Sequence, residues 1–122
     1  MENQQTILLI DDDPSIREVM SLALETRGIE VLTAVNGKEG LDVLELHPET
    51  SLILLDLLMP VMDGWDFIKS VGENQNLNQI PIIVTTASSV APKSIGKTVI
   101  LHKPLDLTIL YNEVEKHVRL DL

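Results

Sequence analysis

Five short runs of apolar residues recur along the chain, and each run ends in polar or turn-forming residues. Residues 7–10, 52–55 and 80–84 are almost continuously apolar, which is typical of strands buried on both faces of a sheet. Residues 30–34 and 99–101 are further candidates for strands. The apolar pattern therefore predicts five short strands.

The stretches between these runs carry apolar residues every three or four positions, which is the spacing of an amphipathic helix. A first helix is predicted after Asp13 and a second after Asn36, because short polar side chains accept hydrogen bonds from the free N–H groups of a helix start. A third helix would begin at Asp63. A last helix, capped by Asp106, would extend through Val118.

Strand and helix alternate along the chain, so the predicted fold class is α/β, a doubly wound five-stranded parallel sheet with helices on both faces. One link is weak, because the segment 88–97 contains Pro92 and Gly96 and lacks helical periodicity. The fourth helix is therefore expected to be short, irregular or missing. The length of 122 residues fits one domain, which would span residues 1–122.

Charge and composition narrow the function classes. The chain has 9 basic and 19 acidic residues, which gives a net charge of −10 at pH 7. This acidic surplus disfavours direct binding to nucleic acid or to an anionic membrane. The chain has no cysteine, so disulfides and thiolate chemistry are excluded. No apolar run approaches the ~18 residues of a membrane span, and the cytoplasm is the expected location.

Polar side chains follow the predicted strands at the ends where parallel strands meet. Asp11 and Asp12 follow the first strand, Asp56 the third, Thr86 the fourth and Lys103 the fifth. In a parallel sheet these ends share one edge, which is where ligands bind. Three converging carboxylates repel one another unless a cation lies between them, and oxygen ligands suit Mg²⁺ or Mn²⁺ better than Zn²⁺. With the hydroxyl and ammonium groups beside them, they predict a phosphoryl site.

Four motifs stand at a spacing that points to a family: Asp11-Asp12 after an apolar run, the segment LDLLMPVMDG at 55–64, the run 82–87, and Lys103-Pro104. With these motifs the chain resembles the receiver domain of two-component response regulators over essentially its whole length. The resemblance implies a flavodoxin-like sheet with strand order 2-1-3-4-5. It also implies a cis peptide bond between Lys103 and Pro104. Ile100 is a departure, because the family often carries an aromatic residue there.

The resemblance assigns roles to the acidic residues at the predicted edge. Asp56 would be the phosphoacceptor. A Mg²⁺ ion, with Mn²⁺ as the other candidate, would be held by the carboxylates of Asp11, Asp12 and Asp56. The backbone carbonyl of Leu58 would complete the protein ligands.

Thr86 and Lys103 would contact the phosphoryl group, Thr86 through a hydrogen bond and Lys103 through an ion pair. The function implied is a phosphorylatable switch that takes phosphate from a sensor histidine kinase or a phosphotransfer protein. A downstream protein target would then read its conformational change. On this hypothesis the chain is not an enzyme with a substrate of its own, and it binds neither nucleic acid nor membrane.

Three other functions stay open. A pseudo-receiver would keep the fold as a docking module and never carry phosphate on Asp56. A Mg²⁺-dependent aspartyl-phosphate phosphatase would use Asp11 as nucleophile and Asp13 as its second acid, although the chain leaves no room for a cap domain. A flavin or nucleotide binder is disfavoured, because no glycine-rich loop follows the first strand. Without a ligand, the acidic residues would form a solvated surface cluster.

Overall fold

Strands and helices alternate in the chain, and a computed structural model describes residues 5–57, 64–87, 94–95, 98–104 and 106–121. The strands are β1 (Thr6–Ile10), β2 (Glu30–Ala34), β3 (Leu52–Asp56), β4 (Ile82–Thr86), β5 (Ser94–Ile95) and β6 (Thr98–His102). The helices are α1 (Pro14–Glu25), α2 (Gly37–Leu46), α3 (Gly64–Glu73) and α4 (Leu107–Val114).

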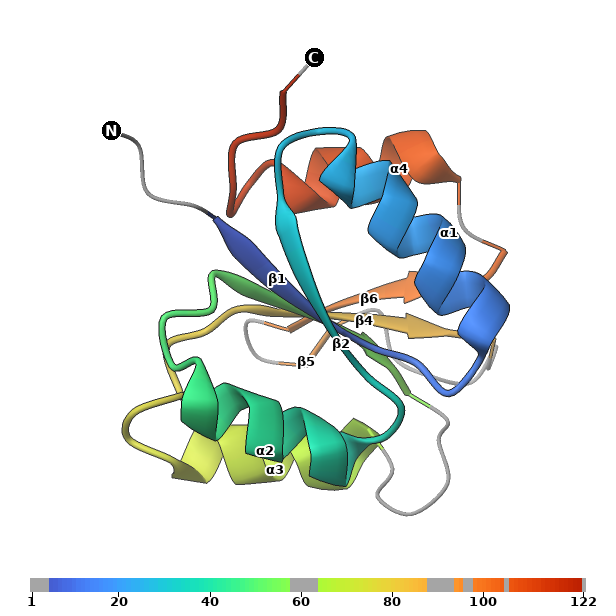
Figure 1. Cartoon of the computed structure of the whole chain (residues 1–122). Coiled ribbons are helices and arrows are strands. Elements are labelled where there is room, and N and C mark those ends of the chain that lie inside the picture. Colours follow the sequence, from blue (N-terminus) through green and yellow to red (C-terminus); the bar gives the residue numbers. More distant parts are fainter. Residues whose placement is uncertain (1–4, 58–63, 88–93, 96–97, 105, 122) are drawn as a thin grey trace.

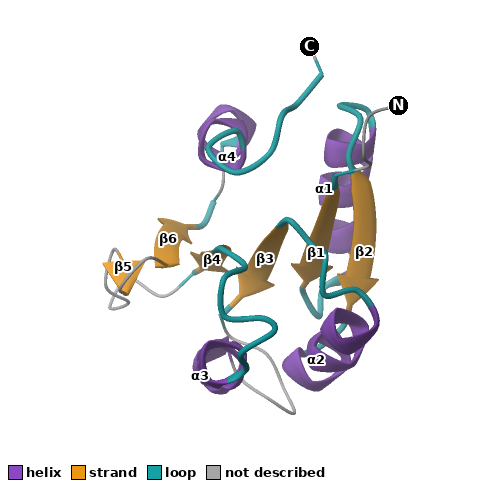
Figure 2. Ribbon diagram, turned by 90° about the vertical axis from the view of Figure 1, so that its left-hand side faces the viewer, coloured by secondary structure: helices purple, strands orange, loops and turns teal. Residues whose placement is uncertain are grey.

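The strands form one sheet in the order β2-β1-β3-β4-β6-β5 (Figure 2). β1 pairs in parallel with β2 and β3, and β4 pairs in parallel with β3 and β6. When the two-residue β5 is left out and β6 is counted as the fifth strand, the order is 2-1-3-4-5. The predicted fold class is therefore confirmed. The parallel arrangement brings the carboxyl ends of these strands to one edge of the sheet.

The sixth strand was not predicted. Within the segment 88–97 the structure describes only Ser94 and Ile95, and these two residues form β5 rather than part of a helix. β5 pairs antiparallel with β6 at the end of the sheet. The segment lacks helical periodicity, and its extended residues supply hydrogen-bond partners for an otherwise unpaired strand edge.

The described helices cover both faces of the sheet, α1 and α4 on one face and α2 and α3 on the other (Figure 1). Ile7 and Leu9 of β1 pack into the core beneath α1 and α4, whereas Leu8 and Ile10 pack beneath α2 and α3. All four side chains are at most 2% exposed. The continuous apolar run is thus a strand buried on both faces, as predicted. None of the described helices is long and apolar enough to cross a membrane.

The helix starts follow the predicted caps where the structure describes them. Asp13 accepts a hydrogen bond from the second residue of α1 at 2.8 Å, and Asp106 accepts one from the second residue of α4 at 2.7 Å. Asn36 accepts a bond of 2.8 Å from the backbone N–H of Glu39, as in a capping box. The predicted cap Asp63 lies outside the described residues.

The boundaries of β4 and of the last helix differ most from the prediction. β4 begins at Ile82 rather than at residue 80 and continues through Thr86. The last helix ends at Val114 rather than Val118, because the N–H of His117 bonds to the Val114 carbonyl and tightens the turn. Val118 nevertheless packs into the core beneath α1 and α4, where it is 5% exposed.

Candidate functional site

Three carboxylates meet at the carboxyl edge of the sheet. Asp11 follows β1 directly, Asp56 ends β3, and the two strands are neighbours in parallel register. One oxygen from each of Asp11, Asp12 and Asp56 lies within 4.8 Å of the others. Asp11 and Asp56 are only 2% and 7% exposed, whereas Asp12 faces solvent. The structure therefore brings together the acidic residues that the sequence singled out.

Backbone and side-chain hydrogen bonds fix Asp11 from several sides. Its N–H donates to the carbonyl of Ala34 on β2 at 3.2 Å. Its Oδ1 accepts a bond of 2.9 Å from the N–H of Asp13. Its backbone carbonyl accepts a bond of 2.6 Å from Nη1 of Arg17 on α1. The contact with Arg17 was not predicted, because the residue stands on the next helix.

Lys103 places a positive charge against the acids. Its Nζ lies 3.5 Å from Oδ1 of Asp56 and 3.7 Å from Oδ2 of Asp11. The backbone N–H of Lys103 donates to the carbonyl of Thr86 at 2.7 Å, which fixes the lysine to the end of β4. The peptide bond between Lys103 and Pro104 is cis, as predicted. One ammonium thus lies within 4 Å of two of the three carboxylates.

The electrostatic surroundings of Asp56 disfavour its ionised form. The pKa of the Asp56 carboxyl is raised from its usual 3.8 to about 6, mainly by burial. The negative charges of Asp11 and Asp12 contribute to this rise, and Lys103 opposes it only in part. A cation placed among the carboxylates would relieve both effects. The donor set consists of oxygen alone, so it fits a hard divalent cation such as Mg²⁺ or Mn²⁺.

Thr86 is fully buried at the end of β4, in register with His102 of β6. Its neighbour Thr85 stands in register with Asp56 of β3 and is 4% exposed. Successive side chains of a strand point to opposite faces, so the two threonines have different surroundings. His102 is exposed to solvent. Leu58, the candidate for a carbonyl ligand, lies outside the described residues.

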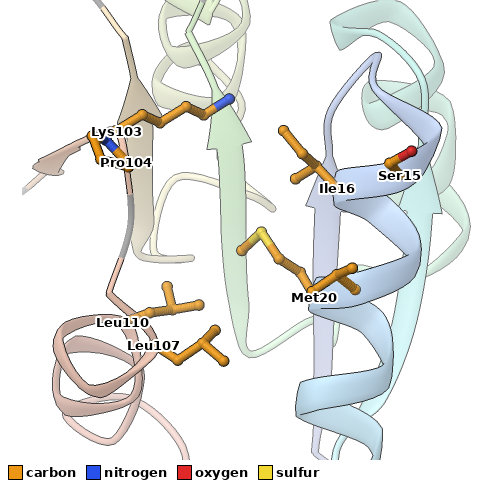
Figure 3. A pocket seen from close by; sticks show the side chains of 8 residues that line it. Ser15, Ile16, Met20, Lys103, Pro104, Leu107 and Leu110 are labelled. Atoms are coloured by element: carbon orange, nitrogen blue, oxygen red, sulfur yellow. The ribbon is translucent and has the colours of Figure 1, made fainter.

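An apolar groove of about 390 Å³ begins beside the site and runs between α1 and α4. Figure 3 shows Lys103 at one end of this groove, with its side chain extending away from Leu107 and Leu110. The stem of Lys103 therefore forms part of the groove while its ammonium reaches the carboxylates. The groove is lined by Ser15, Ile16, Val19, Met20, Lys103, Pro104, Leu107 and Leu110.

Comparison with known sequences identifies relatives of the chain. The family model for the response regulator receiver domain matches residues 7–115. The chain is 33% identical over 114 residues to the transcriptional regulatory protein GlrR of Escherichia coli K12, covering 89% of this chain and 25% of that protein. It is 32% identical over 118 residues to the DNA-binding dual master transcriptional regulator RpaA of Synechocystis, covering 93% of this chain and 48% of that protein. The chain thus spans between a quarter and about half of these relatives.

Solved structures have the same fold. The chemotaxis protein CheY4 of Vibrio cholerae is 30% identical, with a TM-score of 0.84 over 95% of this chain and 100% of that one. The receiver domain of the sensor histidine kinase PA1611 of Pseudomonas aeruginosa gives a TM-score of 0.83 at 24% identity, over 94% of this chain and 98% of that one. That receiver domain was solved with a magnesium ion coordinated in its active site cleft.

Proposed function

The chain belongs to the response regulator receiver domain family, and we propose that it is a phosphorylatable switch whose phosphoacceptor is Asp56. One observation carries the proposal. The Asp56 carboxylate is 7% exposed at the end of a central strand, and the ammonium of Lys103 lies within 4 Å of both it and a second buried acid, Asp11. A nucleophile, a cation and an acidic metal-binding pair are the parts that phosphoryl transfer to a carboxylate requires.

Asp11, Asp12 and Asp56 would hold Mg²⁺, or Mn²⁺, because their oxygens already lie within 4.8 Å of one another. The carbonyl of Leu58 stays a predicted further ligand. When bound, the ion supplies positive charge that offsets the repulsion between the carboxylates and an anionic phosphoryl donor. The protein's own part is to keep two of its carboxylates buried and oriented before the ion arrives.

The proposed step transfers a phosphoryl group from a histidine of a phosphodonor protein. A carboxylate oxygen of Asp56 attacks phosphorus, and the new O–P bond forms as the P–N bond breaks. The leaving imidazole nitrogen takes the electron pair of the broken bond. Lys103 would then pair with the phosphoryl oxygens and Thr86 would donate its hydroxyl to one of them. Water later cleaves the acyl phosphate to inorganic phosphate and the free carboxylate, so no external substrate is turned over.

The groove between α1 and α4 is the proposed docking place of the phosphodonor protein. It is continuous with the site, since Lys103 lines the groove and also contacts Asp56. Val19 on α1 is 59% exposed and Leu107 on α4 is 42% exposed, so an apolar side chain is accessible on each side of the groove. The acidic residues beside them in sequence are exposed as well and would complement basic side chains. The fitting partner is a helix with an apolar ridge and basic flanks.

A downstream protein target is the proposed receiver of the signal. The net charge of −10 argues against direct contact of this chain with nucleic acid. DNA binding is a property of whole relatives such as RpaA, of which the chain matches 48%. The location in the cytoplasm and the organisation of residues 1–122 as a single domain stay predictions.

Phosphorylation by a small donor tests the proposal. The chain is incubated with acetyl phosphate and Mg²⁺, and its intact mass is measured beside that of Asp56→Asn. The expected result is a gain of one phosphoryl mass in the parent, none in Asp56→Asn, and none when EDTA removes the metal. Asp42→Asn is the matched control, because Asp42 is exposed on α2 and its substitution changes the net charge equally.

The same experiment separates the other functions. A parent chain that binds Mg²⁺ and never gains phosphate would be a docking module. Turnover of p-nitrophenyl phosphate would favour the phosphatase. The structure offers an argument against the phosphatase, because Asp13 accepts the capping bond of α1 from Ser15 and does not stand free as a second acid.

A further inference from the structure

Arg17 joins the first turns of α1 to the acidic edge of the sheet. Its Nη1 donates a hydrogen bond of 2.6 Å to the backbone carbonyl of Asp11. The side chain is half-buried, so the contact is partly shielded from water. Arg17 therefore touches the backbone of a site residue, while the carboxylates themselves are contacted by Lys103 and by the N–H of Asp13.

The bonded carbonyl belongs to the peptide plane that joins Asp11 to Asp12. A peptide unit is planar, so fixing the carbonyl of Asp11 also fixes the N–H and the Cα position of Asp12. Asp12 is exposed, and among the described residues no hydrogen bond is made to its carboxylate. The peptide plane on its amino side is then a main constraint on where that carboxylate points.

We propose that Arg17 is a positioning residue for the metal site, which holds the Asp11–Asp12 peptide so that both carboxylates face the ion. The inference rests on the proposed function, because it concerns the binding of Mg²⁺ or Mn²⁺ at that site. Groups that orient metal ligands typically change metal affinity by about 10–100-fold when they are lost. Arg17 acts through Asp11 and Asp12 and does not itself bind the ion.

Positioning and charge predict opposite signs for the loss of Arg17. A guanidinium beside the site repels a divalent cation, so a role through charge alone predicts tighter Mg²⁺ binding once the charge is removed. A role through the peptide plane predicts weaker binding, because the Asp12 carboxylate must then be ordered when the ion binds. The sign of the change in affinity therefore identifies the role.

Isothermal titration of the full chain with MgCl₂, repeated with MnCl₂, tests the inference. We expect Arg17→Gln to weaken binding about 10-fold and Arg17→Lys, which keeps one donor on a long side chain, to recover most of it. Arg27→Gln is the matched control, since the Arg27 guanidinium stacks 4.0 Å over the Tyr111 ring and, within the described part of the chain, forms no ion pair with the three acids. We expect the control to bind within about twofold of the parent, because it removes the same charge and no contact with the site.

A second readout separates positioning from damage to the fold. At saturating Mg²⁺ the rate of labelling by acetyl phosphate should return to near the parent value in Arg17→Gln, with unchanged far-ultraviolet circular dichroism. Binding by Arg17→Gln that is equal to or tighter than the parent's overturns the inference and leaves the proposed function intact. If Arg17→Gln does not fold, Arg17→Met, which keeps a long side chain without a donor, takes its place. Binding by Arg17→Met that is within twofold of the Arg27→Gln control overturns the inference. A parent chain that binds neither ion overturns both.

Discussion

Asp56→Asn should make the metal-free protein more stable at neutral pH, although it removes the proposed phosphoacceptor. The Asp56 carboxyl has a usual pKa of 3.8 and a pKa of about 6 in the folded chain, mainly because of burial. The unfolded chain gives up this proton at lower pH than the folded chain does. Ionisation of Asp56 therefore lowers the free energy of unfolding progressively as the pH rises from about 4 through 6.

The size of the effect follows from this difference in pKa. A rise from 3.8 to about 6 corresponds to at most about 3 kcal/mol above pH 6, at ~1.4 kcal/mol for each tenfold change in proton affinity. Because the neighbouring Asp12 is open to solvent, we expect screening to reduce this to about 2 kcal/mol. At pH 5 the folded carboxyl is mostly protonated, so about half of the gain should remain. Asparagine keeps the shape of the side chain and carries no charge.

Urea unfolding followed by circular dichroism at pH 7.5 and pH 5.0, in EDTA, measures the gain. Asp42→Asn is the control, because an exposed acid on α2 should change stability by less than about 0.5 kcal/mol. The electrostatic reasoning is refuted if Asp56→Asn is no more stable than Asp42→Asn at pH 7.5. It is refuted as well if the gain does not shrink between pH 7.5 and pH 5.0.

Three further predictions concern packing, metal binding and docking. Gly64→Ala should lower the free energy of unfolding in urea by about 1–3 kcal/mol, since the new Cβ would lie 2.8 Å from the Cα of Leu57. Gly72→Ala should raise it by about 0.5 kcal/mol, because Gly72 lies in α3 with open space around it. Saturating Mg²⁺ at 100-fold over its Kd should add about 2.7 kcal/mol to the parent and much less to Asp56→Asn; equal gains would contradict the proposed ligand set. Val19→Glu should slow transfer from any phosphohistidine protein that labels the parent and leave labelling by acetyl phosphate unchanged. Leu46→Glu, at a site 78% exposed on α2, should affect neither, and equal slowing would place docking elsewhere.

The strand pattern was enough to predict the sheet and the edge at which the acids meet. Runs such as residues 52–55 can only be buried on both faces, and a parallel sheet then brings Asp11 and Asp56 together. The helix caps Asp13 and Asn36 could also be predicted, because a capping side chain bonds to backbone N–H groups only two or three residues away. These features depend on neighbours in sequence or on rules common to all parallel sheets.

Other features depend on contacts that a sequence pattern does not contain. β5 has two residues and no periodicity, and it exists because β6 offers a free edge. β4 extends to Thr86 because pairing with His102 of β6 continues past the apolar run. Arg17 bonds to a residue six positions earlier, across a turn, and spacing alone does not reveal how far a long side chain reaches.

The position of Asp56 links its proposed reactivity to a loss of stability. The residue ends a strand with neighbours on both sides, and the N–H of the following Leu57 bonds to the carbonyl of Thr85, so the backbone cannot carry the carboxylate away from Asp11. Repulsion between the carboxylates therefore lowers the stability of the fold. A proton on Asp56, a bound cation or an amide side chain in place of the carboxylate would relieve it. A carboxylate that could relax into solvent would be more stable, but it would no longer lie 3.5 Å from the Lys103 ammonium and beside the two other carboxylates of the proposed metal site. The same rigid strand ending thus lowers stability and would orient the proposed nucleophile.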